Sequence, residues 1–121
     1  MRDFELNPSE LKLLEIIWLN EPVKPSVLTS ICEEKIGWKK STVFTVLKNI
    51  RESGHVSSGR GMIVSLISEK DYYHRLADGF VKKYFHSSFP EFVAAYSDGV
   101  HMSRDMILEC YEAVKYYREG D

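Results

Sequence analysis

The chain has 121 residues and a formal net charge of −2, and 44% of its residues are hydrophobic. This length suits one domain or two very small ones, and the composition is ordinary for a folded, water-soluble chain. No apolar run approaches the roughly eighteen residues that a membrane helix needs, and the opening "MRDFELNPSE" lacks the basic and apolar regions of a signal peptide. We therefore expect a cytoplasmic protein without direct insertion into a membrane.

Positive charge is concentrated in one part of the chain. Residues 35–60 carry six Lys/Arg and one Asp/Glu, whereas residues 1–34 and 87–121 each carry three Lys/Arg and seven Asp/Glu. Acidic and basic residues can separate along a chain while their charges cancel in the total. The basic block is therefore either a binding surface for an anionic partner or a solvated helix face.

Three helices are predicted in the first part of the chain. The segment "LNPSEL" has a capping residue, Asn7, a proline at the first helical position, and Glu10 placed to close a capping box. A proline precedes the second apolar segment, and a glycine follows the second and the third. We expect the helices at 8–20, 25–36 and 40–53. Their inward stripes, at helical spacing, are Leu11, Leu14, Ile17 and Trp18; Val27, Leu28, Ile31 and Cys32; and Val43, Val46, Leu47 and Ile50.

A β-hairpin is predicted after the third helix. Two apolar or β-branched runs, at 55–57 and 62–67, flank Ser58-Gly59-Arg60-Gly61, which has the composition of a turn. Three helices followed by a hairpin indicate a winged helix-turn-helix, in which the third helix enters the major groove of DNA. The expected fold class is mainly α with a small β wing, and the expected winged-helix DNA-binding domain covers 1–67.

This fold explains why positive charge gathers at the third helix. Phosphates flank any helix in the major groove, and short hydroxyl side chains can approach base edges or thymine methyl groups. Phe44, on the outer flank of the helix, either contacts a thymine methyl or packs under the hairpin. The residues expected to bind double-stranded DNA are Lys39, Lys40, Ser41, Thr42, Thr45, Lys48 and Arg60.

The last third of the chain is rich in aromatic residues, and three more helices are predicted there at about 69–86, 89–97 and 104–119. Ser88 and Ser103 are the expected N-caps of the last two. Roughly fifty residues bury too little area to hide so much aromatic surface alone. A symmetric partner would cover it; alternatively, these helices fold back onto the first domain as one core. The residues expected to form the dimer contact of this helical domain, 68–121, are Tyr73, Leu76, Phe80, Tyr84, Phe89, Phe92, Ile107, Tyr111 and Val114.

Neither a catalytic nor a metal site is predicted, and we expect no cofactor. The four histidines, His55, His74, His86 and His101, are expected to be surface or partly packed residues. They are scattered, without HExxH spacing, and the chain has no GxSxG motif and no phosphate-binding loop. Cys32 and Cys110 belong to no CxxC pair and are expected to be small core residues. We therefore expect that the protein is not an enzyme, and the competing class is a winged-helix module that binds protein instead of DNA.

Three segments carry a resemblance to a known family: "LKLLEIIWLNEPV", "GWKKSTVFTVLKNIRESGHV" and "SEKDYYHRLADGFVKKYFHSSFPEFVAAY". From Leu6 onward the chain resembles the penicillinase-repressor family (the BlaI/MecI group). The matching positions are Trp18, Trp38, Thr42, Thr45 and Gly54. The resemblance implies a homodimeric bacterial transcriptional repressor, which binds operator dyads with TACA/TGTA-type elements and dimerises through its C-terminal helices.

The resemblance also implies a release mechanism and a role in antibiotic resistance. In the family a membrane-bound β-lactam sensor with a zinc-protease domain triggers cleavage within the dimerisation region, at a position that matches Ala95 and Tyr96. Ser41, Thr42 and Thr45 match base-contacting positions.

This chain departs from the family pattern in several places. It has Lys39-Lys40-Ser41 where the family has Ser-Pro-Lys, so Ser41 either caps the helix or contacts bases. Its wing is shorter, and Ala95-Tyr96 replaces the Asn-Phe bond that is cleaved in the family. A ligand-responsive regulator without proteolytic induction is therefore an alternative.

Overall fold

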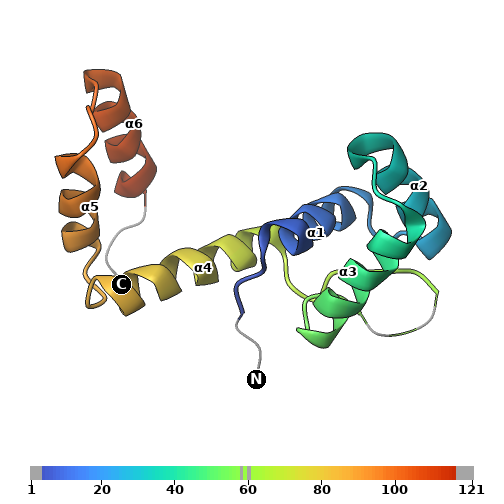
Figure 1. The fold of residues 1–121 in the computed structure, drawn as a ribbon. Helices are drawn as coiled ribbons and strands as arrows, with labels where there is room; N and C mark the ends of the chain where they lie inside the picture. Colours follow the sequence, from blue (N-terminus) through green and yellow to red (C-terminus); the bar gives the residue numbers. More distant parts are fainter. Residues whose placement is uncertain (1–3, 58, 60, 117–121) are drawn as a thin grey trace. The chain divides into compact units, whose positions relative to one another are not determined.

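A computed structural model of the chain describes residues 4–57, 59 and 61–116 (Figure 1). The chain divides into two compact units, Met1–Asp78 and Gly79–Asp121, which we describe separately. The helices, in chain order, are α1 (Pro8–Asn20), α2 (Pro25–Ile36), α3 (Lys40–Glu52), α4 (Glu69–Tyr84), α5 (Phe89–Asp98) and α6 (Arg104–Lys115).

The helix bounds agree closely with the capping signals in the sequence. Asn7 Oδ1 accepts a hydrogen bond from the Glu10 backbone N–H (2.8 Å), and Glu10 Oε1 accepts one from the Asn7 N–H (3.1 Å), which closes the predicted capping box of α1. Ser88 and Ser103 cap α5 and α6 as predicted, since each side chain accepts from a backbone N–H three residues later. Two helices end clearly before their predicted bounds: α4 ends at Tyr84 instead of 86, and α6 ends at Lys115 instead of 119, where 117–119 lie outside the described residues.

The core of the first unit lies between α1, α2 and α3, which pack against one another (Figure 1). The predicted stripe of α3 is confirmed, because all four of its residues are buried. The prediction for Val27 is wrong: this side chain is 46% exposed, and Thr29 is buried on α2 instead. Thr29 tolerates burial because its hydroxyl donates to the Ser26 carbonyl at 2.9 Å.

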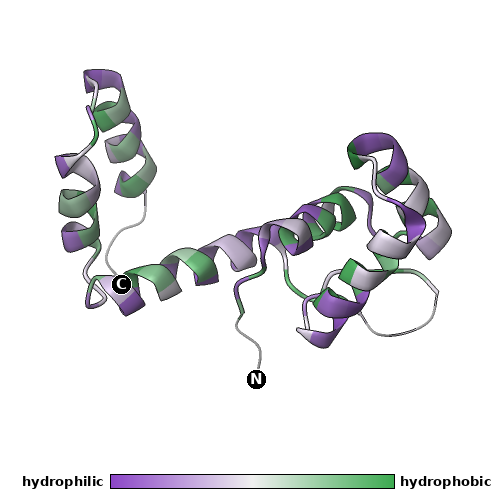
Figure 2. Cartoon of the chain, viewed as in Figure 1, coloured by the Kyte–Doolittle hydropathy of each residue, from purple (hydrophilic) through white to green (hydrophobic). Residues whose placement is uncertain are grey.

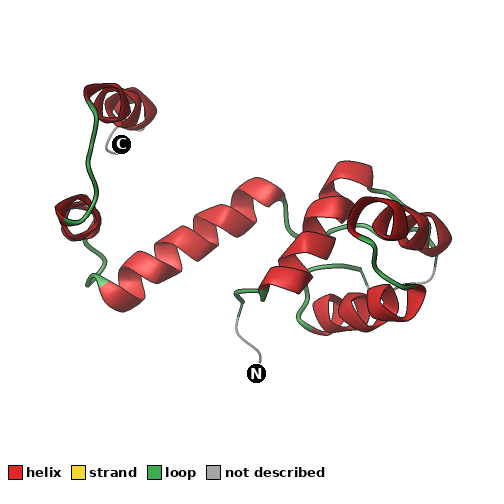
Figure 3. Cartoon of the chain, turned by 45° about the horizontal axis from the view of Figure 1, so that its top comes forward, coloured by secondary structure: helices red, strands yellow, loops and turns green. Residues whose placement is uncertain are grey.

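The segment after α3 forms two isolated antiparallel bridges, Val23 with Ile63 and Val56 with Ser65. Backbone hydrogen bonds from the Ser57 N–H to the Val64 carbonyl and from the Leu66 N–H to the His55 carbonyl, each 2.9 Å, support the second bridge. Among the described residues this region contains no longer strand, and Figure 3 draws it as loop. The two predicted runs therefore meet, but only as bridges, so the β wing stays a prediction.

A carboxylate holds this bridged segment to the turn between α1 and α2. Glu21 Oε1 accepts hydrogen bonds from the Ser65 backbone N–H (2.7 Å) and from the Ser65 hydroxyl (2.8 Å). Because hydrogen bonds to charged groups are stronger than neutral ones, this contact fixes the returning segment beside the three helices.

Tyr72 anchors the start of α4 in the first unit. Its side chain is fully buried, and its hydroxyl accepts a hydrogen bond from the Leu6 backbone N–H at 3.0 Å. The ring lies 5.0 Å from Phe4, 5.9 Å from Trp18 and 5.8 Å from His55, measured between centroids. Helical periodicity did not predict the role of Tyr72, because it favours the neighbouring Tyr73 as the residue on the apolar stripe of this helix.

Two further contacts link the start of α4 and the preceding segment to the core. The Trp18 indole Nε1–H donates to the Ile67 carbonyl at 2.9 Å. Leu76, one turn after Tyr72, is half-buried and packs against the same core. The first turns of α4 therefore belong to the first unit.

The second unit exposes its apolar side chains. None of the described residues from Gly79 to Tyr116 is buried, although hydrophobic residues recur along α5 and α6 (Figure 2). Phe85 and Phe92 rings lie 5.4 Å apart, and Phe80 stands 6.1 Å from Phe92. The prediction that Cys110 is a core residue is wrong, since Cys110 is exposed. The described helices also lack the length and hydrophobicity that a bilayer crossing requires.

Replacing Tyr72 by Phe tests the anchor. The variant removes the acceptor of the buried Leu6 N–H, so we expect the free energy of unfolding to fall by about 1–3 kcal/mol. Urea denaturation followed by circular dichroism measures this change. Tyr73→Phe is the matched control, because Tyr73 is 40% exposed and the structure shows no hydrogen bond of its hydroxyl to the described residues. Equal destabilisation of the two variants would contradict the anchor.

Candidate nucleic-acid interface

Helix α3 has a buried face and an exposed face. Val43, Val46, Leu47 and Ile50 form the buried face. Since residues three and four apart share one side of a helix, burial of this stripe turns the remaining side chains outward. The predicted DNA-binding residues Lys39, Lys40, Ser41, Thr42, Thr45 and Lys48 are all exposed. Arg60, also predicted to bind DNA, lies outside the described residues.

The N-terminus of α3 has no side-chain cap. Lys39 occupies the N-cap position with extended backbone angles (φ −70°, ψ 154°), and no side-chain hydrogen bond caps the helix. Ser41 is the second residue of the helix and is exposed, so it does not occupy the capping position. Of the two roles that the sequence left open for Ser41, the structure excludes capping.

Thr45 uses its hydroxyl proton within the helix. Its Oγ1 donates to the Ser41 carbonyl at 3.0 Å, one turn earlier. The oxygen lone pairs remain able to accept a hydrogen bond, and the methyl group is available for apolar contact. Thr45 can therefore accept from a base amino group, such as adenine N6 or cytosine N4, without breaking its internal bond.

Arg51 belongs to the basic block but has a structural role. Its Nε donates to the Ser57 carbonyl at 2.9 Å and holds the segment that follows α3. The guanidinium keeps its charge but is held against this segment, whereas Lys39, Lys40 and Lys48 are exposed among the described residues.

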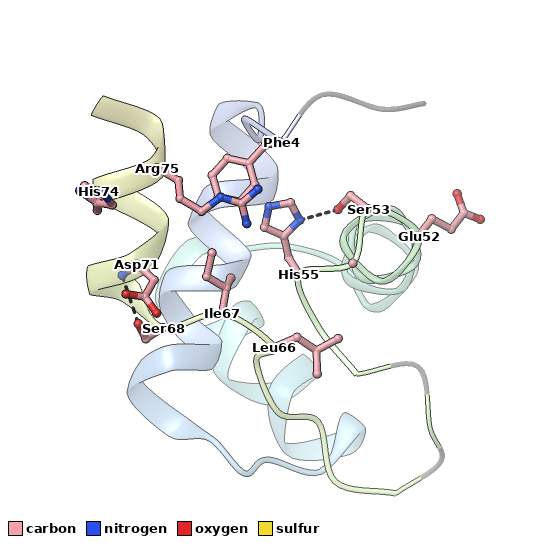
Figure 4. A pocket seen from close by; sticks show the side chains of 11 residues that line it. Phe4, Glu52, Ser53, His55, Leu66, Ile67, Ser68, Asp71, His74 and Arg75 are labelled. Carbon is pink, nitrogen blue, oxygen red and sulfur yellow. Dashed lines mark hydrogen bonds between the residues drawn. The ribbon is translucent and has the colours of Figure 1, made fainter. Parts of the chain in front are cut away.

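An open cavity of about 1050 Å³ lies beside the end of α3 in the first unit (Figure 4). Its walls come from the residues around Phe4, from the end of α3, from the segment before α4 and from the first turns of α4. The Arg75 guanidinium lies 3.9 Å from the centroid of the Phe4 ring, and Ser68 Oγ accepts from the Asp71 N–H. Acidic Glu52 and Asp71 line the cavity together with Arg75, so its charge favours no one class of ligand.

His55 is buried at the same place, which corrects the expectation that the histidines are surface or partly packed residues. Its Nδ1 lies 2.8 Å from the Ser53 hydroxyl, and its ring is 5.1 Å from Phe4. Within the described part of the chain no group of three His, Cys, Asp or Glu side chains could hold a metal ion. Burial raises the pKa of the Cys32 thiol, which keeps it in the neutral form that suits a core residue.

The comparison with protein families identifies the chain's relatives. A family model described as "Penicillinase repressor" matches residues 6–115, nearly the whole chain. The chain belongs to the penicillinase repressor family. No curated protein matches the chain. Penicillinase repressors are DNA-binding transcriptional regulators, so the prediction that the protein is not an enzyme is confirmed.

The uncapped N-terminus of α3 gives a prediction that is independent of DNA. A serine at position 39 would have the extended geometry in which an N-cap hydroxyl accepts a first-turn N–H. We expect Lys39→Ser to be more stable than Lys39→Ala by about 0.5–2 kcal/mol. Both variants remove the same charge, so chemical denaturation of the pair isolates the cap. Equal stabilities would show that another group already satisfies these N–H groups.

Proposed function

We propose that this penicillinase repressor acts in the cytoplasm as a homodimer that binds a dyad operator, with α3 of each protomer in the major groove and the segment after α3 as a β wing beside the backbone. The observation that carries the proposal is the exposed face of α3, which presents lysines and hydroxyl side chains in a chain of net negative charge. Lysines on such a face suit phosphates, and Ser41, Thr42 and Thr45 suit base edges.

The charge distribution favours DNA over a protein partner for this face. A winged-helix module that binds a protein through α3 does not require a cluster of exposed lysines at this helix. Lys39, Lys40 and Lys48 are exposed, and the structure shows none of them in an ion pair with a described residue. Neutralising phosphates with these groups would release counterions, which is the main source of affinity for DNA.

The exposed apolar surface of the second unit supports dimerisation. On α6, Ile107, Tyr111 and Val114 share one face and are 52%, 61% and 48% exposed. Phe80, at the end of α4, is 48% exposed. Contiguous apolar surface of this kind marks an interaction site, and a second copy is the partner that a dyad operator requires.

Dimerisation would let one protein molecule bind two half-sites at once. When two binding units are linked, the second binding event becomes intramolecular, and the combined affinity exceeds that of one unit by about 10²–10⁴-fold. Anything that separates the protomers would therefore release the operator without altering α3.

Proteolysis is the release step that the family resemblance implies, by a membrane-bound sensor protease acting between Ala95 and Tyr96. Both side chains are exposed, which supports access, but both lie inside helix α5. Cleavage would need α5 to unwind locally, because exposed loops are the usual sites of proteolysis. Dissociation caused by a bound ligand is the alternative.

The role of the lysines can be tested with random-sequence duplex DNA. Replacing Lys39, Lys40 and Lys48 by Ala should weaken binding to all sequences. It should also reduce the slope of log K against log salt concentration by about 0.9 for each phosphate that the protein no longer neutralises. Fluorescence anisotropy between about 50 and 200 mM salt measures the slope.

A matched control for this experiment replaces Lys12, Lys70 and Lys83, which are exposed on other helices. This variant has the same net charge as the α3 variant. An equal reduction of the slope in both would show that α3 has no particular role.

The dimer can be tested by placing a charge on the exposed face of α6. Tyr111→Lys should make the full-length chain monomeric at micromolar concentration, because a buried ammonium in the contact would be unpaired. Light scattering measures the mass. Glu109→Lys, on the same helix but off the stripe, should remain dimeric. A monomeric unmodified chain would overturn the proposal.

A further inference from the structure

Phe44 differs from the other apolar side chains of α3. The buried face of the helix is filled by Val43, Val46, Leu47 and Ile50, whereas Phe44 is 41% exposed. Its ring is not among the half-buried side chains that pack against the core, and it makes no ring contact with another described residue. The core of the first unit therefore does not explain a phenylalanine at this position.

The neighbours of Phe44 are positively charged. Lys40 precedes it by four residues and Lys48 follows it by four, so the three side chains share one face of the helix. At about 1.5 Å of rise per residue, each lysine starts about 6 Å along the axis from Phe44. If both ammonium groups contact phosphates, the ring between them faces the groove.

Isolated apolar side chains on a protein surface are normal and need no explanation. The position of Phe44 makes this case different, because all residues of α3 are described and Phe44 is its one exposed large apolar side chain. Phe44 lies between two lysines, Lys40 and Lys48, whose charge favours binding to a polyanion such as DNA. The apolar group that the major groove offers to such a side chain is the C5-methyl of thymine.

We propose that Phe44 contacts the C5-methyl group of a thymine in each half-site and thereby determines a preference for thymine over other bases at that position. The proposal deepens the proposed function and rests on it, since it requires α3 to lie in the major groove. It assigns base specificity to an apolar contact in addition to the hydrogen bonds available to Thr45.

The test removes one methyl group at a time from the DNA. Duplexes that bind the purified full-length chain are selected from a random library, and each thymine of the selected site is then replaced by deoxyuridine in both half-sites. At one position we expect binding to weaken by about fourfold per half-site, the factor that corresponds to about 0.8 kcal/mol for one buried methyl. For Phe44→Ala, thymine and deoxyuridine at that position should bind equally well.

Two further variants control the experiment. Phe44→Leu keeps an apolar side chain and should retain part of the preference for thymine. Leu19→Ala removes a large side chain that is 85% exposed on α1, and it should leave the full preference in place. The melting temperature of Phe44→Ala should equal that of the unmodified chain, because the ring does not pack in the core.

Three results would overturn the proposal. The unmodified chain could bind thymine and deoxyuridine duplexes equally at every position. Phe44→Ala could keep the same preference, which would assign the methyl contact to another residue. A lower melting temperature, together with equal weakening on both duplexes, would mean that Phe44 packs under the turn after α3. Failure to select any duplex would instead reject the proposed function itself.

Discussion

Burial of one stripe of α3 is the constraint on which the candidate interface depends. Val43, Leu47 and Ile50 fill the space between the three packed helices, and a rotation of α3 about its axis would expose them. A shift by one residue rotates a helix by about 100°, which would bring Thr42 or Phe44 into the core. Burial of this stripe therefore determines which side chains of α3 face outward, although the buried residues themselves are not available to contact DNA. The chemistry of the outer face could be inferred from the sequence because the inner face is so regular.

Aromatic packing around Tyr72 is the second constraint. The hydroxyl of Tyr72 satisfies the Leu6 N–H, and its ring joins Phe4, Trp18 and His55 in one cluster. These contacts join the segment before α1 and the first turns of α4 to helix α1. Because these segments are far apart in sequence, the contact depends on tertiary structure alone. The hydrogen bond between the Tyr72 hydroxyl and the Leu6 N–H also satisfies a buried polar group that an apolar side chain at position 72 would leave without a partner.

Local signals predicted the helices well, and long-range contacts account for the errors. Capping at Asn7, Ser88 and Ser103 and the stripe of α3 follow from sequence spacing and are confirmed. Val27 was placed inward because periodicity alone allows the stripe of a short helix to shift by one residue. Tyr72 and Tyr73 are adjacent, so only the packing partners decide which one is buried. The exposed outer face of α3 was predicted correctly. The sequence did not decide whether Phe44 contacts a thymine methyl or packs under the hairpin.

The positions of the tryptophans, including Trp18 with its indole N–H bonded to the Ile67 carbonyl, allow the unfolding of the two units to be followed separately. The chain has two tryptophans, Trp18 and Trp38, and both lie in Met1–Asp78. The remaining residues, 79–121, carry only phenylalanine and tyrosine as aromatic side chains. Tryptophan emission therefore reports on the first unit, whereas the far-ultraviolet signal of helices reports on both. Transitions followed by the two signals coincide only when the units lose structure together, so one denaturation sample distinguishes loss of the C-terminal helices from loss of the unit that carries α3.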